Sequence, residues 1–243
     1  MPDMREANAD EPDDSWSSGV NLPAGEAAAA DKRLLVTLRS LLTAALPVLY
    51  PRALFIVFGF GAITALAFAY AEVLSLRVAA TVILLPSIVG TVVLGLRYRG
   101  WGWRALVGYS AGLMAVALYD VLRLGLVEVG FWDDPIPHIG TLLIGDQNPH
   151  FWWGYLWRFY GNGAGMGMAY AMLPWRGVTS GVIFGTAVCL GLFALLIVAP
   201  TAEAHFFSLT PLTALGALAG HWVYGIVLGW ATATRIPKAE RDR

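Results

Sequence analysis

The chain has 243 residues, of which 57% are hydrophobic and only 14% are charged. Soluble globular domains are about one quarter charged, so this composition excludes an ordinary soluble domain and indicates an integral membrane protein. The net charge is −1 and the basic residues lie beside apolar segments, which excludes a nucleic-acid-binding surface.

Residues 1–30 are polar and carry seven acids and one base, so we expect a disordered cytoplasmic tail. This tail lacks the basic start and short apolar core of a cleavable signal peptide, so the first spanning helix is expected to direct insertion. Residues 31–50 are amphipathic, but Arg39 and Pro47 oppose a full crossing and favour an interfacial helix. The transmembrane domain is then 51–232, and 233–243 form a basic cytoplasmic tail.

A helix needs about 20 mostly apolar residues to cross a bilayer. Six segments qualify, at 53–74, 76–96, 105–129, 151–173, 178–199 and 209–232. The predicted fold is therefore all-α, a polytopic bundle of six transmembrane helices. Small residues four apart let helix backbones approach closely. They occur at Gly108/Gly112, Gly161/Gly165, Gly163/Gly167, Gly177/Gly181/Gly185, Gly216/Gly220 and Gly225/Gly229.

The basic residues predict the orientation of the bundle. With both termini in the cytoplasm, 13 of the 16 basic residues lie inside and only Arg77 lies in an outer loop. Positive charge gathers on the cytoplasmic side of membrane proteins, so we expect this orientation. The connector 131–150 then faces outside.

Charged residues inside spanning segments are costly and point to function. In the third segment, Tyr119, Asp120 and Arg123 fall in the outer half, and Glu128 lies near the outer surface. Arg158 of the fourth segment would lie about 10 Å below that surface, with Asn162 about one turn deeper.

Asp120, Arg123 and Arg158 should therefore meet at one depth. Two interpretations are open. The cluster is either an ion-pair lock between two helices or a ligand site. In the second case, the spare guanidinium would use Glu128 or bind an anionic ligand or lipid headgroup.

The predicted outer face also carries residue types that bind divalent metals. They are His138, His150, His205, Asp133, Asp134, Asp146 and Glu203. Their spacing matches no zinc motif, and we expect no metal. The run from Asp146 to His150 is also a typical helix start.

His221 lies near the middle of the sixth segment and is a candidate haem ligand, a proton relay or a hydrogen-bonding contact to a neighbouring helix. No second spanning histidine exists to form a bis-histidine haem site. The aromatic run 151–160 is typical of an interfacial aromatic belt. The glycines at 163–167 indicate close packing against a neighbouring helix. No cofactor or catalytic motif is identified.

Two glycine-rich helices carry a resemblance to known proteins. Residues 221–229 resemble the H-x-x-Y-G-x-x-L-G helix of uncharacterised multi-pass prokaryotic membrane proteins. A second similarity to the same group lies in Gly145, Asp146, His150, Tyr160, Gly161, Gly163, Ala164 and Gly165. The resemblance implies a multi-pass fold in a prokaryotic cytoplasmic membrane, and it implies no activity.

Three functional hypotheses follow. The first is a non-enzymatic structural or accessory subunit of a larger membrane assembly, whose partners would be the bilayer and other membrane subunits. The second is a small transporter or ligand-binding protein that uses Asp120, Arg123 and Arg158. The third is an extracytoplasmic metal-binding membrane protein that uses the outer histidines and acids.

Overall fold

A computed structural model describes residues 32–33, 36–37, 40, 49–131 and 133–236. The predicted tail at 1–30, most of the predicted interfacial helix and residues 237–243 lie outside the described residues. The chain divides into two compact units, 1–46 and 47–243. The second unit holds every element discussed below.

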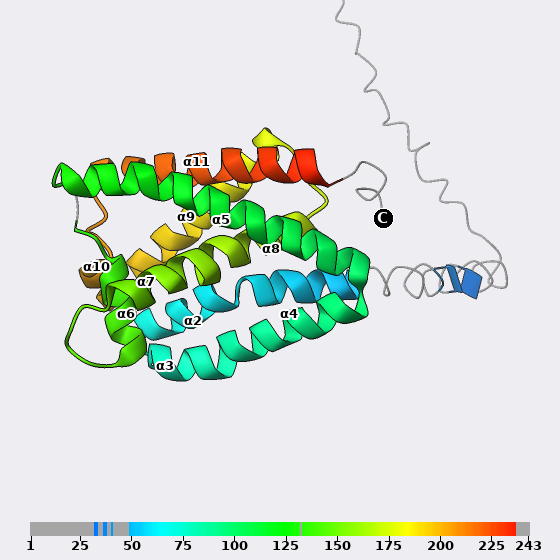
Figure 1. Ribbon diagram of the computed structural model, residues 1–243, viewed down its shortest axis with the longest axis horizontal. Coiled ribbons are helices and arrows are strands. Elements are labelled where there is room, and N and C mark those ends of the chain that lie inside the picture. The colour runs from blue at the N-terminus through cyan, green and yellow to red at the C-terminus, as the bar shows by residue number, and fades with distance from the viewer. Residues whose placement is uncertain (1–31, 34–35, 38–39, 41–48, 132, 237–243) are drawn as a thin grey trace, which may run out of the picture. The chain divides into compact units, whose positions relative to one another are not determined.

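The described residues of this unit are helical and contain no strand, which confirms the expected all-α fold. A helix spans Leu49–Gly59. It is followed by α2 (Gly61–Tyr70), α3 (Leu76–Ala79), the π-helical segment η2 (Ala80–Leu84), α4 (Leu85–Arg97), α5 (Arg99–Glu128), α6 (Ile136–Ile144), α7 (Phe151–Leu156), the π-helical segment η3 (Trp157–Gly163), α8 (Ala164–Met172), α9 (Val178–Val198), α10 (Pro200–His205) and α11 (Pro211–Arg235) (Figure 1).

Four helices of the described chain are long and apolar enough to cross a membrane: Leu76–Arg97, α5, α9 and α11. The bent pair Leu49–Gly59 and α2 makes a fifth if it counts as one span. The predicted segment 151–173 is helical as α7, η3 and α8, but it is not among these helices. Its sequence is rich in Gly, Trp and Tyr and contains Arg158 and Asn162, which lowers its apolar character.

The first predicted segment, 53–74, is bent rather than straight. The axis of its second helix is bent by 44° from that of the first, and the bend lies at Phe60, between two glycines. A Cβ atom added at Gly59 would lie 2.6 Å from the carbonyl oxygen of Gly165, and one added at Gly61 would lie 2.6 Å from Ser87 Oγ. The glycines at this kink therefore allow the first helix to approach α8 and α2 to approach α4.

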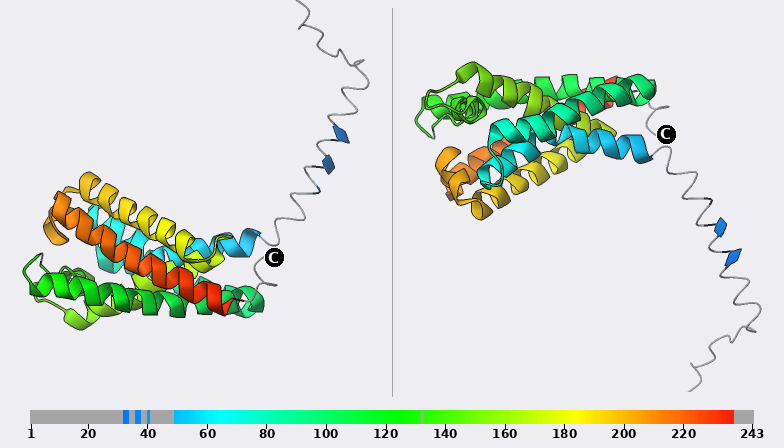
Figure 2. Two further views of the ribbon diagram at one scale, coloured as in Figure 1. Left: turned by 90° about the horizontal axis from the view of Figure 1, so that it is seen from above. Right: turned by 90° about the horizontal axis from the view of Figure 1, so that it is seen from below.

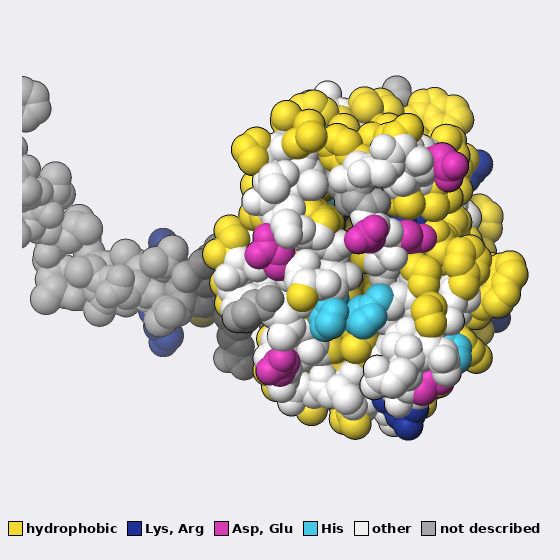
Figure 3. All heavy atoms as spheres, turned by 90° about the vertical axis from the view of Figure 1, so that its left-hand side faces the viewer, with side chains coloured by type: hydrophobic (Ala, Val, Ile, Leu, Met, Phe, Trp, Pro, Cys, Tyr) yellow, Lys and Arg dark blue, Asp and Glu magenta, His cyan; other side chains and the backbone are white. Residues whose placement is uncertain are grey.

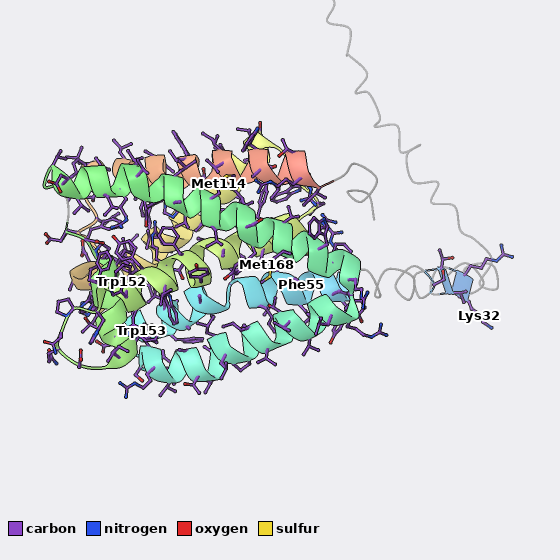
Figure 4. The ribbon with its side chains drawn as sticks, viewed as in Figure 1. Lys32, Phe55, Met114, Trp152, Trp153 and Met168 are labelled. Atoms are coloured by element: carbon purple, nitrogen blue, oxygen red, sulfur yellow. The ribbon has the colours of Figure 1, made fainter. Side chains whose placement is uncertain are left out.

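The centre of the bundle is α8, and all nine of its residues are buried. Phe55 of the first helix packs with Met168 (Figure 4). The Tyr170 ring lies 5.2 Å from that of Phe184 on α9. Because α8 is surrounded by protein, it needs small side chains for close packing more than an apolar, lipid-facing surface.

The predicted glycine-mediated packing is confirmed at two helix pairs. A Cβ atom at Gly108 of α5 would lie 2.5 Å from the Gly167 carbonyl oxygen of α8. On the other side of the bundle, Cβ atoms at Gly181 of α9 and Gly225 of α11 would each collide with the other's backbone. Figure 2 shows α11 between α5 and α9, so these contacts join the helices into one bundle.

Three arginines cap the C-terminal end of α8. Arg52 Nη2 donates to the Met172 carbonyl at 2.8 Å, and Arg104 Nε and Arg176 Nη2 donate to the Ala171 carbonyl, each at 3.2 Å. The last carbonyls of a helix lack intrahelical partners and carry the negative end of its dipole. These basic residues therefore stabilise the central helix in addition to making this end of the bundle positive.

The connector 131–150 contains the helix α6, which the sequence analysis did not assign. It ends at Gly145, whose φ of 78° is a left-handed conformation that glycine adopts readily. A Cβ atom at Gly154 of α7 would collide with the Ile136 carbonyl of α6. Trp152 and Trp153 of α7 lie exposed beside α6, at the end of the bundle opposite the three arginines (Figure 4).

Candidate functional site

The polar cluster is built on α5 and on the π-helical segment η3. Asp120 and Arg123 are three residues apart on α5, while Arg158 and Asn162 are four apart on η3. A π-helix has a wider turn than an α-helix, and single π-helical turns are frequent at functional sites. Arg158 and Asn162 line the same cavity.

Asp120 contacts both Arg123 and Arg158, so the three side chains meet at one depth as expected. The Asp120 Oδ1 atom accepts from Arg123 Nε at 3.0 Å and from Arg158 Nη2 at 2.7 Å. The Asp120 and Arg123 side chains are each only 4% exposed, and that of Arg158 is 14% exposed. The second carboxylate oxygen, Oδ2, is buried without a hydrogen-bond partner in the described chain.

A second carboxylate, Asp134, completes this network. Arg123 Nη1 donates to Asp134 Oδ1 at 2.6 Å, and Arg123 Nη2 donates to Tyr155 Oη at 2.8 Å. Tyr155 Oη in turn donates to Asp134 Oδ2 at 2.9 Å, and the Ile136 amide donates to Oδ1 at 3.0 Å. Every side-chain nitrogen of Arg123 therefore has a partner.

Glu128 was one of two alternatives considered as a partner for the spare guanidinium, and the structure places a different carboxylate there. Glu128 is exposed at the end of α5, and Asp134 takes its place. The sequence analysis had assigned Asp134 to the metal candidates. Asp134 pairs with Arg123 because the chain turns back after α5 and brings Asp134 over Arg123, while Glu128 lies on another face of the helix. The sequence feature that could have suggested a structural role for Asp134 is its position directly before Pro135, at the start of a helix.

A cavity of about 400 Å³ lies beside the network. It is mainly apolar, with walls from α2 and α9 that include Ile63, Phe184, Val188 and Leu192. Polar groups gather at one end, where Tyr119, Arg123, Arg158, Asn162 and His221 line it. Pockets of roughly 300–1,000 Å³ with apolar walls and a few convergent polar groups are typical ligand sites.

Three polar side chains on the cavity wall are incompletely paired within the described part of the chain. Asn162 is only 9% exposed, yet its Oδ1 atom is buried without a hydrogen bond in the described chain. Arg158 uses Nε and Nη2 on Asp120. His221 Nδ1 lies 2.8 Å from the Ala217 carbonyl of its own helix, so a neutral ring donates there and presents Nε2 as an acceptor.

The aromatic rings hold these groups in place. The His221 ring contacts the Tyr119 ring edge to face, with centroids 5.3 Å apart. The Arg158 guanidinium lies 4.5 Å from the centroid of the same Tyr119 ring. Tyr119 thus contacts both His221 and Arg158. The hydrogen bond that was considered between His221 and a neighbouring helix is not found among the described residues. His221 Nδ1 bonds to Ala217 of its own helix, and His221 contacts α5 through the Tyr119 ring.

The outer candidate ligands do not form a metal cluster among the described residues. The rings of His138 and His205 stack with centroids 4.2 Å apart. His150 and Asp146 form a separate pair at 2.8 Å, and this hydrogen bond lowers the pKa of the Asp146 carboxyl. Acidic and histidine side chains gather on this end face of the bundle (Figure 3).

A second pocket, of about 530 Å³, lies around the stacked histidines. Asp133, Asp134, His138, Glu203 and His205 line it. It shares three lining residues with the inner cavity, namely Pro135, Phe206 and Phe207. These three side chains therefore separate an outer, polar pocket from the inner, mainly apolar cavity.

Comparisons with known proteins give no assignment for this arrangement, because no protein-family profile, curated protein or solved structure matches the chain significantly.

Proposed function

We propose that the chain is a non-enzymatic membrane protein that binds a small membrane-soluble molecule in the cavity beside Asp120. The observation that carries this proposal is the amide of Asn162, which is buried, lines the cavity and has an unpartnered Oδ1 atom. Leaving a buried polar group unsatisfied costs about 1–3 kcal/mol. A bound molecule that donates a hydrogen bond to Asn162 offsets this cost.

The proposal includes six membrane crossings with both termini in the cytoplasm of a prokaryote. The bent pair at residues 49–70 and the helical run 151–172 would add two crossings to the four long apolar helices. Figure 1 places the α4–α5 turn, the α8–α9 turn and the end of α11 at one end of the bundle, as this arrangement requires. The basic residues Arg52, Arg104 and Arg176 lie at the C-terminal end of α8.

The second candidate is an accessory subunit in which the network only locks helices together. One observation favours it: Arg123 and Arg158 are both paired with carboxylates, so the network is complete in charge without a ligand. The lock does not explain Asn162, whose amide takes no part in the ion pairs. We therefore place ligand binding first.

The test uses the full chain purified in mild detergent, with extraction and mass spectrometry of bound molecules. We expect the wild type to retain a small molecule at a defined ratio and Asn162→Leu to lose it. Because Leu is similar in size to Asn and removes an unsatisfied group, the ligand-free variant should melt no lower than the ligand-free wild type.

Asn148→Leu is the matched control, since Asn148 is exposed outside the cavity, and it should keep the molecule. Equal retention by Asn162→Leu and the wild type would contradict the proposal. A wild type that carries no small molecule and elutes only in a larger complex would favour the accessory subunit.

Reporter fusions test the orientation separately. We expect residue 140 outside and residues 20, 100 and 240 inside, because of the excess of basic residues on the inner side. An inside signal at residue 140 together with an outside signal at residue 100 would reverse the assignment.

A further inference from the structure

We propose that the cavity selects a single-chain amphiphile with an uncharged, hydroxyl-bearing head group, which enters from the bilayer beside α9. This inference rests on the proposed function and specifies its ligand. The head group would lie at the polar end of the cavity, and the chain would lie along the apolar walls of α2 and α9.

The charge balance of the network argues for an uncharged head. Asp120 and Asp134 neutralise Arg123 and Arg158, and the guanidinium of Arg123 is fully used by Asp120, Asp134 and Tyr155. An incoming carboxylate or phosphate would bring an unbalanced charge into a buried site or displace Asp120 from Arg158. Either event carries the cost of a buried, unpaired charge.

The hydrogen-bonding groups argue for a hydroxyl. Arg158 and Asn162 line the cavity and carry N–H donors, and acceptors there are Asn162 Oδ1 and Nε2 of a neutral His221. A hydroxyl group both donates and accepts, so a head with one or two hydroxyls satisfies both kinds of group. A head that only accepts would leave Asn162 Oδ1 unpartnered.

The opening of the cavity argues for entry from the bilayer. Ala187 and Gly191 line the cavity and are also exposed on α9, so the cavity reaches the lipid-facing surface there. A Cβ atom added at Gly191 would meet no atom within 4 Å. Small side chains at this position keep the opening free for an apolar chain.

The test compares three probes with the same twelve-carbon chain: monolaurin, laurate and dodecylamine. Binding to the full chain in phosphatidylcholine nanodiscs is measured by native mass spectrometry at pH 9, where laurate is ionised. We expect monolaurin to bind at least tenfold more tightly than laurate or dodecylamine. Equal or tighter binding of a charged probe would overturn the uncharged head but leave the proposed function standing.

Binding of none of the three probes would overturn the inference, whereas the proposed function is judged by the co-purified molecule and its loss in Asn162→Leu.

Gly191→Phe tests the entry route, because it fills the opening without displacing a neighbour. The matched control is Gly125→Phe on α5, where an added Cβ atom also meets nothing within 4 Å. Monolaurin binding should fall at least tenfold in Gly191→Phe alone. Equal binding by both variants would exclude this route.

Discussion

Arg123 on α5 binds Asp134, eleven residues further along the chain, through a 2.6 Å contact between Nη1 and Oδ1. This contact balances the charge of the buried network, which otherwise holds two guanidinium groups against Asp120 alone. It also changes which substitutions preserve that balance. Removing Asp120, Arg123 and Arg158 together would leave Asp134 without its cation.

The first prediction concerns the pairing of Asp120. Asp120→Leu leaves Arg158 without a carboxylate, and breaking a buried pair typically costs about 3–5 kcal/mol. Asp120→Leu combined with Arg158→Met removes one charge of each sign and keeps the Arg123–Asp134 contact, so it should recover much of this loss. Thermal melting in detergent measures both variants. A double variant that melts below the single variant would show that Arg158 stabilises the fold independently of Asp120.

The second prediction follows from the charge balance and concerns ligand choice. Asp134→Asn keeps the size of the side chain but gives the network a net positive charge. We expect laurate to gain at least tenfold in binding relative to monolaurin at pH 9, because its carboxylate then restores neutrality. The control is Asp133→Asn, at the exposed neighbouring position, which should leave the preference unchanged. An unchanged preference in Asp134→Asn would show that charge balance does not select the head group.

The third prediction concerns pH. Burial lowers the pKa of His138, and the neighbouring His205 lowers it further. The unfolded chain therefore binds a proton at this residue more readily than the folded chain. Stability from neutral His138 is present above its ordinary pKa of about 6.5 and is lost as the pH falls below that value.

His138→Phe is the variant that checks this pH dependence, since it keeps a ring for the 4.2 Å stack on His205 but removes the titrating group. The difference in melting temperature between pH 7.5 and pH 5.5 should be smaller in His138→Phe than in the wild type. An equal difference in the two proteins would mean that other groups account for the pH dependence.

The fourth prediction concerns the contact between α9 and α11. Gly181→Val places a side chain against the Gly225 backbone, where a Cβ atom would already collide. Overpacking of this kind typically costs about 1–3 kcal/mol, and more where the backbone cannot move. Gly125→Val, in open space on α5, is the control and should melt close to the wild type. Similar melting of both variants would argue against a tight α9–α11 contact.

Much of the architecture follows from local sequence patterns. Apolar runs of sufficient length identify the helices that can cross a membrane, because the hydrophobic thickness of the bilayer sets a minimum length. The spacing of Asp120 and Arg123 places them on one face of α5, and glycines at four-residue spacing mark where backbones approach. These properties depend on residues close together in the chain, so the sequence alone determined them.

Other features depend on which segments become neighbours, and only the tertiary structure decided them. The sequence pattern suggested Glu128 as a partner for the spare guanidinium and placed Asp134 among the metal candidates, but the turn after α5 brings Asp134 into contact with Arg123. The run 151–172 is not among the long apolar helices, and only the packed bundle shows that its last part, α8, is completely buried. The cavity exists because α2, α5, η3, α9 and α11 leave a space between them, lined by Asn162 and His221. Burial and empty volume are properties of the packed helices, so no pattern along a single helix specifies them.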